Sequence, residues 1–293
     1  MKDWLDSLQN PPADYRPLPF WSWNDRLDAS FLRWQVRQMR DAGLGGFFMH
    51  ARSGLETEYL GGEWMKCVAA CADEAKQSGM QSWLYDENGW PSGFAGGRVT
   101  ALGDAYYGRW LSIEQAAAGE PAEGENILGV YREEGGRFCR ADSPRADCPR
   151  LIVRDRFTPF YIDVMNAEAV KAFLRFTHCR YQKEMGGRVG SSVFGFFTDE
   201  PRLSGDVSGD IPWSHAIPAE FRRTYGYDIL EKLPALFRPC RGFEKIRYDF
   251  WQLVSRLFVS SYIRQISGWC HENHCRLTGH IMMEESVFTQ MTG

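Results

Sequence analysis

The run of residues 193–201 constrains the fold of this chain most strongly. It is a short apolar stretch, rich in phenylalanine, that ends in Asp199, Glu200 and Pro201. Apolar runs of this length are typical of strands buried on both faces of a parallel sheet. Proline has no backbone N–H and cannot continue the ladder of a central strand, so the strand is predicted to end there. The two carboxyl groups then lie at the carboxyl end of a strand, where parallel α/β proteins build functional sites.

Apolar runs followed by polar residues recur along the chain. Strands are predicted at residues 19–23, 45–50, 80–85, 193–200 and 277–283. Helices with one apolar face are predicted between them, and either Asp28 or Ser30 suits the cap of the first helix. Further helices are expected at 63–78, 166–186 and 244–271. This alternation predicts an α/β fold, an incomplete TIM (β/α)8 barrel with one functional face. Because such a barrel has eight strands, the chain is expected to be part of a longer protein.

Residues 98–157 interrupt this alternation. Short strands are predicted at 107–114, 127–131, 137–140 and 151–156. We expect a small β-rich insertion here. The predicted domains are therefore residues 1–97 as the first part of the barrel, 98–157 as the insertion, and 158–293 as the continued and truncated barrel.

The composition argues against several classes of function. The net charge is -4 and no basic stripe occurs, so nucleic acid is not an expected partner. The sequence contains no apolar run of roughly 18 residues, so no membrane span is predicted. No apolar leader opens the chain, so the eight cysteines are expected to be reduced in the cytoplasm. The 11 tryptophans fit either a large core or a groove of rings that suit the apolar faces of sugars.

Glu200 is the leading candidate for a general acid. Glycoside hydrolysis needs two carboxyl groups, one held protonated as the acid and one ionised as the base or nucleophile. Glu200 follows a run with three phenylalanines, and burial beside them would favour its protonated form. Asp199 is expected to point the other way if the strand alternates cleanly. The alternative is that Asp199, Glu200 and Pro201 only terminate a strand.

The second carboxyl group is predicted to be Glu284 or Glu285. If His280 and Met282 face inward, the period of two in a strand places Glu284 inward as well. A shift of the strand by one residue selects Glu285. The alternative is an acid in a solvated loop.

The loop after the third strand is long and rich in glycine. It begins with Asp86, Glu87 and Asn88 and contains Trp90. Long loops inside compact domains are usually functional. These oxygen-bearing residues suit sugar hydroxyls or a hard cation such as calcium, and a hydrogen-bonded turn is the competing interpretation.

Residues 270–275 contain cysteine and histidine at a spacing that zinc sites use. The pairs lie at a predicted helix end and point to different faces. Histidines near a helix C-terminus interact favourably with its dipole, which is the favoured interpretation.

Five motifs, taken together and in order, resemble the glycoside hydrolase family 106 α-L-rhamnosidases. They are residues 19–25, 43–52, 84–93, 198–201, and 278–280 with Glu284 and Glu285. The resemblance extends from residue 19 to 288. It implies a (β/α)8 catalytic barrel, inverting hydrolysis of terminal α-L-rhamnose, and calcium near the sugar. By position, Glu200 corresponds to the acid and either Glu284 or Glu285 to the base.

The predicted sugar subsite combines the strand ends with the loop. Its members are Trp23, Asn24, His50, Arg52, Asp86, Glu87, Asn88, Trp90, Asp199 and His280. Members of the resembling family are much longer and carry β-sandwich domains. The expected partners are therefore a carbohydrate substrate, the last barrel strands and those domains.

Two other functions fit the same residues. One is a glycosidase for another sugar, such as a uronic acid or fucose, and basic residues around the pocket would favour an acidic sugar. The other is a carbohydrate-binding segment without catalysis, for which Glu200→Gln would leave sugar binding intact.

Overall fold

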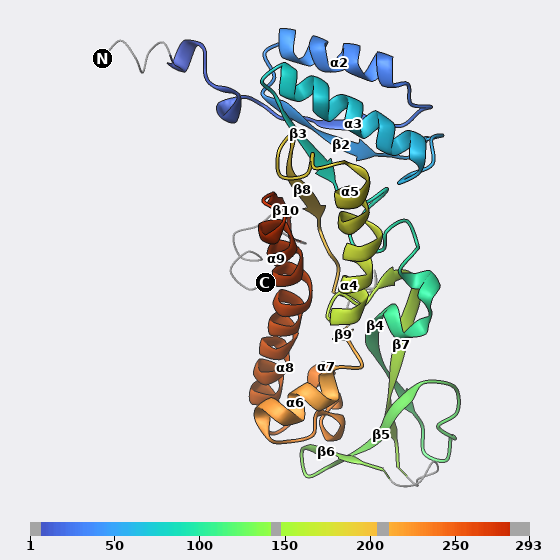
Figure 1. The fold of residues 1–293 in the computed structure, drawn as a ribbon. Helices are drawn as coiled ribbons and strands as arrows, with labels where there is room; N and C mark the ends of the chain where they lie inside the picture. Colours follow the sequence, from blue (N-terminus) through green and yellow to red (C-terminus); the bar gives the residue numbers. More distant parts are fainter. Residues whose placement is uncertain (1–6, 142–147, 204–210, 282–293) are drawn as a thin grey trace. The chain divides into compact units, whose positions relative to one another are not determined.

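The computed structural model describes residues 7–141, 148–203 and 211–281 (Figure 1). The chain divides into two compact units. The first unit comprises residues 1–99, 171–201 and 264–293, and the second comprises residues 100–170 and 202–263.

The first unit is built on a five-stranded sheet in the order β1-β2-β3-β8-β10. All its neighbouring strands run parallel. The strands are β1 (Phe20–Trp23), β2 (Gly46–Ala51), β3 (Gln81–Tyr85), β8 (Val193–Asp199) and β10 (Arg276–His280). The parallel strands expected from the sequence are therefore confirmed, and the first four match their predicted limits within one residue.

Helices α2 (Ala29–Asp41), α3 (Gly62–Gln77), α5 (His178–Glu184) and α9 (Arg264–Glu272) belong to this unit, as does the 3₁₀ turn η1 (Ala13–Tyr15). Asp28 caps α2, because its Oδ1 accepts a hydrogen bond from the N–H of Phe31 at 2.8 Å. One of the two predicted caps is thus confirmed.

Two long predicted helices are interrupted in the structure. The helix expected at 166–186 divides at Thr177 into α4 (Ala167–Phe176) and α5, and the Thr177 hydroxyl donates to the carbonyl of Phe173 at 2.8 Å. The helix expected at 244–271 is α8 (Phe243–Phe258), a π-helical turn η5 (Val259–Ile263) and α9. Apolar spacing does not reveal such breaks, because the apolar face continues through them.

One face of the parallel sheet packs against helices. Trp23 of β1 lies edge-on to Trp64 of α3, with ring centroids 5.0 Å apart. Phe196 of β8 contacts Tyr181 of α5 and Trp269 of α9, at 5.9 Å and 5.7 Å. These buried rings form the core between the sheet and its helices.

The opposite face of the sheet carries a second row of rings. Phe20, Phe48, Tyr85 and Phe197 project from four neighbouring strands with centroids 4.8–6.1 Å apart. Phe20 remains 45% exposed. Among the described residues, β1 and β10 form the two edges of the sheet and do not pair with each other. The TIM barrel therefore stays a prediction.

The second unit is built on an antiparallel sheet in the order β6-β5-β7-β4-β9. The strands are β4 (Tyr107–Ala116), β5 (Ile127–Glu134), β6 (Arg137–Arg140), β7 (Arg150–Ile162) and β9 (Ile211–Trp213). Its helices include α6 (Ile217–Tyr225), α7 (Pro234–Phe237) and α8, with short turns η2 (Thr100–Leu102), η3 (Asp104–Tyr106) and η4 (Ile229–Glu231). The β-rich character expected of this segment is confirmed, whereas β9 escaped prediction because three residues show no periodicity.

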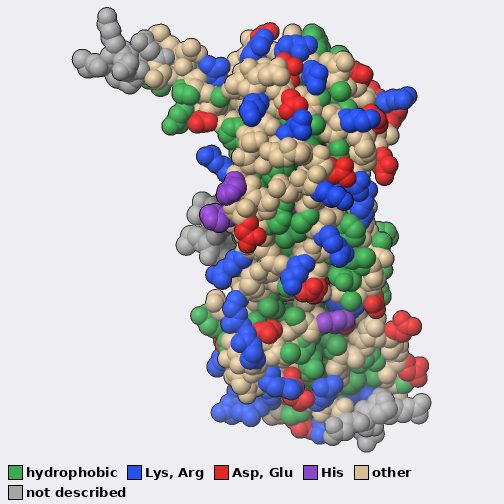
Figure 2. All heavy atoms as spheres, in the orientation of Figure 1, with side chains coloured by type: hydrophobic (Ala, Val, Ile, Leu, Met, Phe, Trp, Pro, Cys, Tyr) green, Lys and Arg blue, Asp and Glu red, His purple; other side chains and the backbone are tan. Residues whose placement is uncertain are grey.

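The surface agrees with the balanced composition. Figure 2 shows Lys and Arg side chains interspersed with Asp and Glu side chains on the displayed face. None of the helices in the described residues combines the length and hydropathy of a membrane span. All eight cysteines are free.

Replacing Phe196 by alanine tests the core between the sheet and its helices. Phe196 is fully buried, so the smaller side chain leaves a cavity, and the free energy of unfolding should fall by about 3–5 kcal/mol. The same change at Phe160, which is 84% exposed, should alter it by no more than about 0.5 kcal/mol. Chemical denaturation measures both, and equal losses would contradict the described packing.

Candidate active site

Side chains from four neighbouring strands meet at the carboxyl edge of the parallel sheet. The hydroxyl of Tyr85, the last residue of β3, donates to Asp199 Oδ2 at 2.7 Å. Nδ1 of His280 lies 3.5 Å from Oδ1 of the same carboxylate. The rings of His50 and Tyr85 stack with their centroids 3.5 Å apart. The structure thus gathers His50, Asp199 and His280 around one tyrosine.

Glu200 directly follows this cluster, but its side chain has a separate partner. The indole N–H of Trp90 donates to Glu200 Oε2 at 2.9 Å. The backbone of Glu200 has a φ of 44°, in the left-handed region, and its N–H donates to the carbonyl of His280 at 3.1 Å. A non-glycine residue in this region carries strain that the surrounding structure must offset. Glu200 itself is half-buried.

Asp86 connects the loop after β3 to the end of β8. Its side chain is fully buried, and Ser92 Oγ donates to Asp86 Oδ1 at 2.5 Å. The same Oγ accepts the N–H of Asp199 at 2.8 Å, while the N–H of Ser92 donates to the carbonyl of Asp199 at 2.8 Å. Burial raises the pKa of Asp86 well above its ordinary value, although the Ser92 hydrogen bond favours the ionised form. Asp86 therefore stabilises the edge of the site from within.

Glu87 holds the loop itself together. Its carboxylate is fully buried and accepts the backbone N–H groups of Asn88, Ala95 and Gly96 at 2.9, 2.6 and 2.7 Å. Burial raises the pKa of Glu87 to about 7, against these donors, which favour the ionised form. The hydrogen-bonded turn considered from the sequence is therefore present, and the half-buried Asn88 lies on it.

His50 is a neutral imidazole near pH 7. It is buried at the end of β2, and burial, followed by the positive charge of Arg52, lowers the pKa of His50 to about 4. Arg52 is exposed, as is Asn24 after β1. Trp23 lies instead in the core against α3, on the face of the sheet opposite to Tyr85. Glu284 and Glu285 lie outside the described residues.

Two residues of the cluster were missed by sequence reasoning, Tyr85 and Ser92. Tyr85 ends a predicted strand, but its pairing with Asp199 requires the register of β3 on β8, in which Tyr85 lies beside Phe197. Ser92 lies within the predicted glycine-rich loop. Its position two residues after Trp90 was the only available signal, because its partners come from the tertiary fold.

A calcium ion at this edge would need a cluster of oxygen ligands. Calcium takes six to eight oxygen ligands, and no group of three or more His, Cys, Asp or Glu side chains in the described ranges is placed to hold a metal. The Glu87 oxygens are already occupied by backbone donors. Calcium binding therefore stays a prediction. Residues 270–275, which contain the Cys and His motif, likewise form no such group within the described part of the chain.

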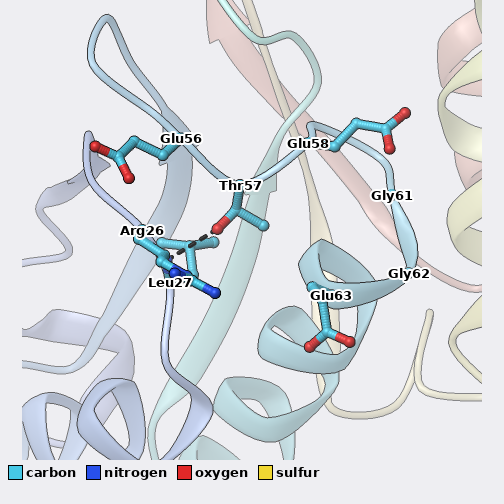
Figure 3. A pocket seen from close by; sticks show the side chains of 8 residues that line it. All are labelled: Arg26, Leu27, Glu56, Thr57, Glu58, Gly61, Gly62 and Glu63. Carbon is cyan, nitrogen blue, oxygen red and sulfur yellow. Dashed lines mark hydrogen bonds between the residues drawn. The ribbon is translucent and has the colours of Figure 1, made fainter.

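A cavity of about 540 Å³ lies beyond the ends of β1 and β2 (Figure 3). It is lined by Arg26, Leu27, Glu56, Thr57, Glu58, Gly61, Gly62 and Glu63. The N–H of Leu27 donates to Thr57 Oγ1 at 2.9 Å, and Figure 3 shows the carboxylates of Glu56 and Glu58 pointing away from each other. None of the residues predicted for the sugar subsite lines this cavity, so it is separate from the cluster around Tyr85.

Comparison with known proteins finds a solved structure with a similar fold. No protein-family model and no curated protein matches the chain. A solved structure of a rhamnosidase from Novosphingobium sp. PP1Y superposes with a TM-score of 0.65 at 13% sequence identity. The match covers 96% of this chain and 47% of that one. The fold is rhamnosidase-like. This chain spans about half the length of that rhamnosidase, and membership of family 106 stays a prediction.

Replacing Glu87 by glutamine should remove a pH-dependent part of the stability. The folded pKa of Glu87 is about 7 against an ordinary value of 4.5, so the folded protein binds the proton more tightly. This contribution is fully present below pH 4.5 and is lost as the pH rises through about 7. It amounts to at most about 3 kcal/mol.

Chemical denaturation between pH 4.5 and 7.5 measures this effect. The free energy of unfolding of the wild type should fall more steeply with rising pH than that of Glu87→Gln. Glu63→Gln, which changes an exposed glutamate on α3, is the matched control and should keep the wild-type slope. Equal slopes in the wild type and Glu87→Gln would contradict the prediction.

Proposed function

We propose that this chain carries the general acid of an inverting exo-glycosidase of family 106 that hydrolyses terminal α-L-rhamnosides. The observation that carries the proposal is the position of Glu200 at the carboxyl edge of a rhamnosidase-like sheet, beside Asp199, His280 and Trp90. A shared fold alone does not establish an activity. The residues at this edge are therefore the substantive support.

Glu200 is the best placed acid among the described carboxyl groups of this edge. Asp86 and Glu87 are fully buried and hold the loop. Asp199 accepts the Tyr85 hydroxyl and lies beside His280. Glu200 is half-buried, and no described residue donates a hydrogen bond to its Oε1. A carboxyl oxygen in this situation is able to approach a glycosidic oxygen.

In the proposed reaction, Glu200 transfers its proton to the glycosidic oxygen as the bond to the sugar breaks. Glu284 or Glu285 takes a proton from the water that attacks the opposite face of the sugar, which inverts the anomeric centre. The neutral His50, together with His280 and Asp199, would orient the sugar hydroxyls by hydrogen bonds. The row of rings formed by Phe20, Phe48 and Phe197 provides the apolar side of this subsite.

Glu200→Gln should strongly slow the hydrolysis of an alkyl α-L-rhamnoside, because glutamine keeps the shape but cannot donate the proton that the leaving oxygen needs. We expect kcat to fall by a factor of about 100 or more. Glu63→Gln is the control and should retain activity. The anomer of the first-formed sugar, followed by NMR with a natural rhamnoside, should be inverted.

Other outcomes discriminate between the alternatives. A retained anomer would disprove inversion, which requires the two carboxyl groups to lie about 6.5–9.5 Å apart. Cleavage of a fucoside or glucuronide in place of the rhamnoside would support Glu200 as the acid but would change the proposed substrate. Sugar binding without any turnover, unaffected by Glu200→Gln, would support a carbohydrate-binding segment.

Calcium dependence is a separate part of the proposal, and it rests on the family resemblance. Treatment with EDTA should lower the hydrolysis of 4-nitrophenyl α-L-rhamnoside, and added calcium should restore it while magnesium should not, because magnesium demands tighter octahedral geometry. Calorimetric titration of the metal-free protein with calcium provides a readout without activity. Full activity in EDTA and no binding heat would exclude the ion.

A further inference from the structure

We infer that Trp90 is a positioning residue for Glu200: its indole N–H holds Oε2, so that Oε1 presents the catalytic proton and the carboxylate left after proton transfer is stabilised. The catalytic part of this inference rests on the proposed function. The hydrogen bond itself, from Trp90 Nε1 to Glu200 Oε2 at 2.9 Å, is a feature of the structure.

The loop fixes the indole relative to Glu200. The Glu87 carboxylate binds the backbone of the loop on both sides of Trp90, at Asn88 before it and at Ala95 and Gly96 after it. Between these points, Ser92 exchanges two hydrogen bonds with the backbone of Asp199, the residue before Glu200. The donor and the acceptor are therefore tied to one another through the main chain.

The backbone of Glu200 is held in place, as its side chain is. Its left-handed conformation, with φ at 44°, is unusual for a residue with a side chain, and its N–H is bound to the carbonyl of His280. Strained backbone of this kind concentrates at functional sites, where the surrounding structure maintains it. The strain and the indole hydrogen bond together define the direction in which the carboxyl group points.

The chemistry assigns different roles to the two oxygens of Glu200. In the neutral acid, the oxygen that accepts an N–H hydrogen bond is the carbonyl oxygen. This oxygen is Oε2, so the proton lies on Oε1. In the reaction, that proton moves to the glycosidic oxygen, the bond from this oxygen to the sugar carbon breaks, and the bonding electron pair remains on the leaving oxygen. Glu200 becomes a carboxylate whose charge is shared by both oxygens.

The indole hydrogen bond gains strength during this step. An N–H donor binds a charged carboxylate more strongly than a neutral acid. Because the gain develops as the proton leaves, it stabilises the transition state more than the bound substrate, and it raises kcat without a matching change in KM. A residue that only packed against the sugar would instead change KM.

Trp90→Phe isolates the N–H. The indole is 46% exposed, and phenylalanine keeps an aromatic ring at the same place without the donor. We expect kcat for an alkyl α-L-rhamnoside to fall about 10- to 100-fold with KM little changed.

Trp251→Phe is the matched control. Trp251 lies on α8 in the second unit and is 45% exposed, so the same change is made at nearly the same exposure. It should leave kcat and KM unchanged. An unchanged kcat in Trp90→Phe, or a change confined to KM, would overturn the inference.

A second measurement is independent of turnover. The indole N–H resonance of Trp90, assigned in ¹H–¹⁵N spectra by its absence from Trp90→Phe, should change its chemical shift in Glu200→Ala, because that variant lacks the acceptor oxygen. An unchanged chemical shift in Glu200→Ala would overturn the inference. Absence of any glycosidase activity, with this change of chemical shift present, would overturn the catalytic role and the proposed function while leaving the hydrogen bond established.

Discussion

The arrangement of the candidate site depends on the buried carboxylate of Glu87. Three backbone N–H groups of the loop after β3 converge on it, and no solvent competes for these hydrogen bonds. A buried carboxylate is costly unless it is fully hydrogen-bonded, so this one specifies a single loop conformation. Trp90 and Ser92 lie within this loop, and the conformation of the loop sets their positions. The side chains that approach Glu200 and Asp199 therefore depend on a residue that is itself inaccessible.

The parallel sheet supplies the second constraint by separating two rows of rings. Trp23 and Phe196 face the helices and form a dry core, whereas Phe20, Phe48 and Phe197 face the other way. Side chains alternate between the two faces of the sheet along each strand. One register of the strands therefore sets the face on which each of these five rings lies. The row that faces away from the helices continues at the carboxyl edge into Tyr85 and His50. The apolar and polar parts of the candidate subsite thus arise from the same alternation.

Strand positions were predictable because buried parallel strands need nearly continuous apolar residues, which are visible at 193–199 without any structure. The polar residues after each run followed from the same pattern. The contact between Tyr85 and Asp199 was not predictable, because it depends on how β3 and β8 are aligned. Glu87 was expected to face a ligand, and the structure instead shows its oxygens bound to the backbone of its own loop.

The sequence by itself determined the parallel α/β character of the first unit and the clustering of polar residues at one edge. Local hydrophobic patterns and strand-ending residues are sufficient for both. Only the tertiary structure decided which carboxyl groups hold the fold and which remain available for chemistry. Asp86, Glu87, Asp199 and Glu200 all lie at or just after the end of a buried strand. Asp86 and Glu87 accept hydrogen bonds from their own loop. Asp199 and Glu200 accept theirs from Tyr85 and Trp90, which are distant in the chain. Desolvation and hydrogen bonding are properties of the assembled sheet and loop, and they distinguish these four acids.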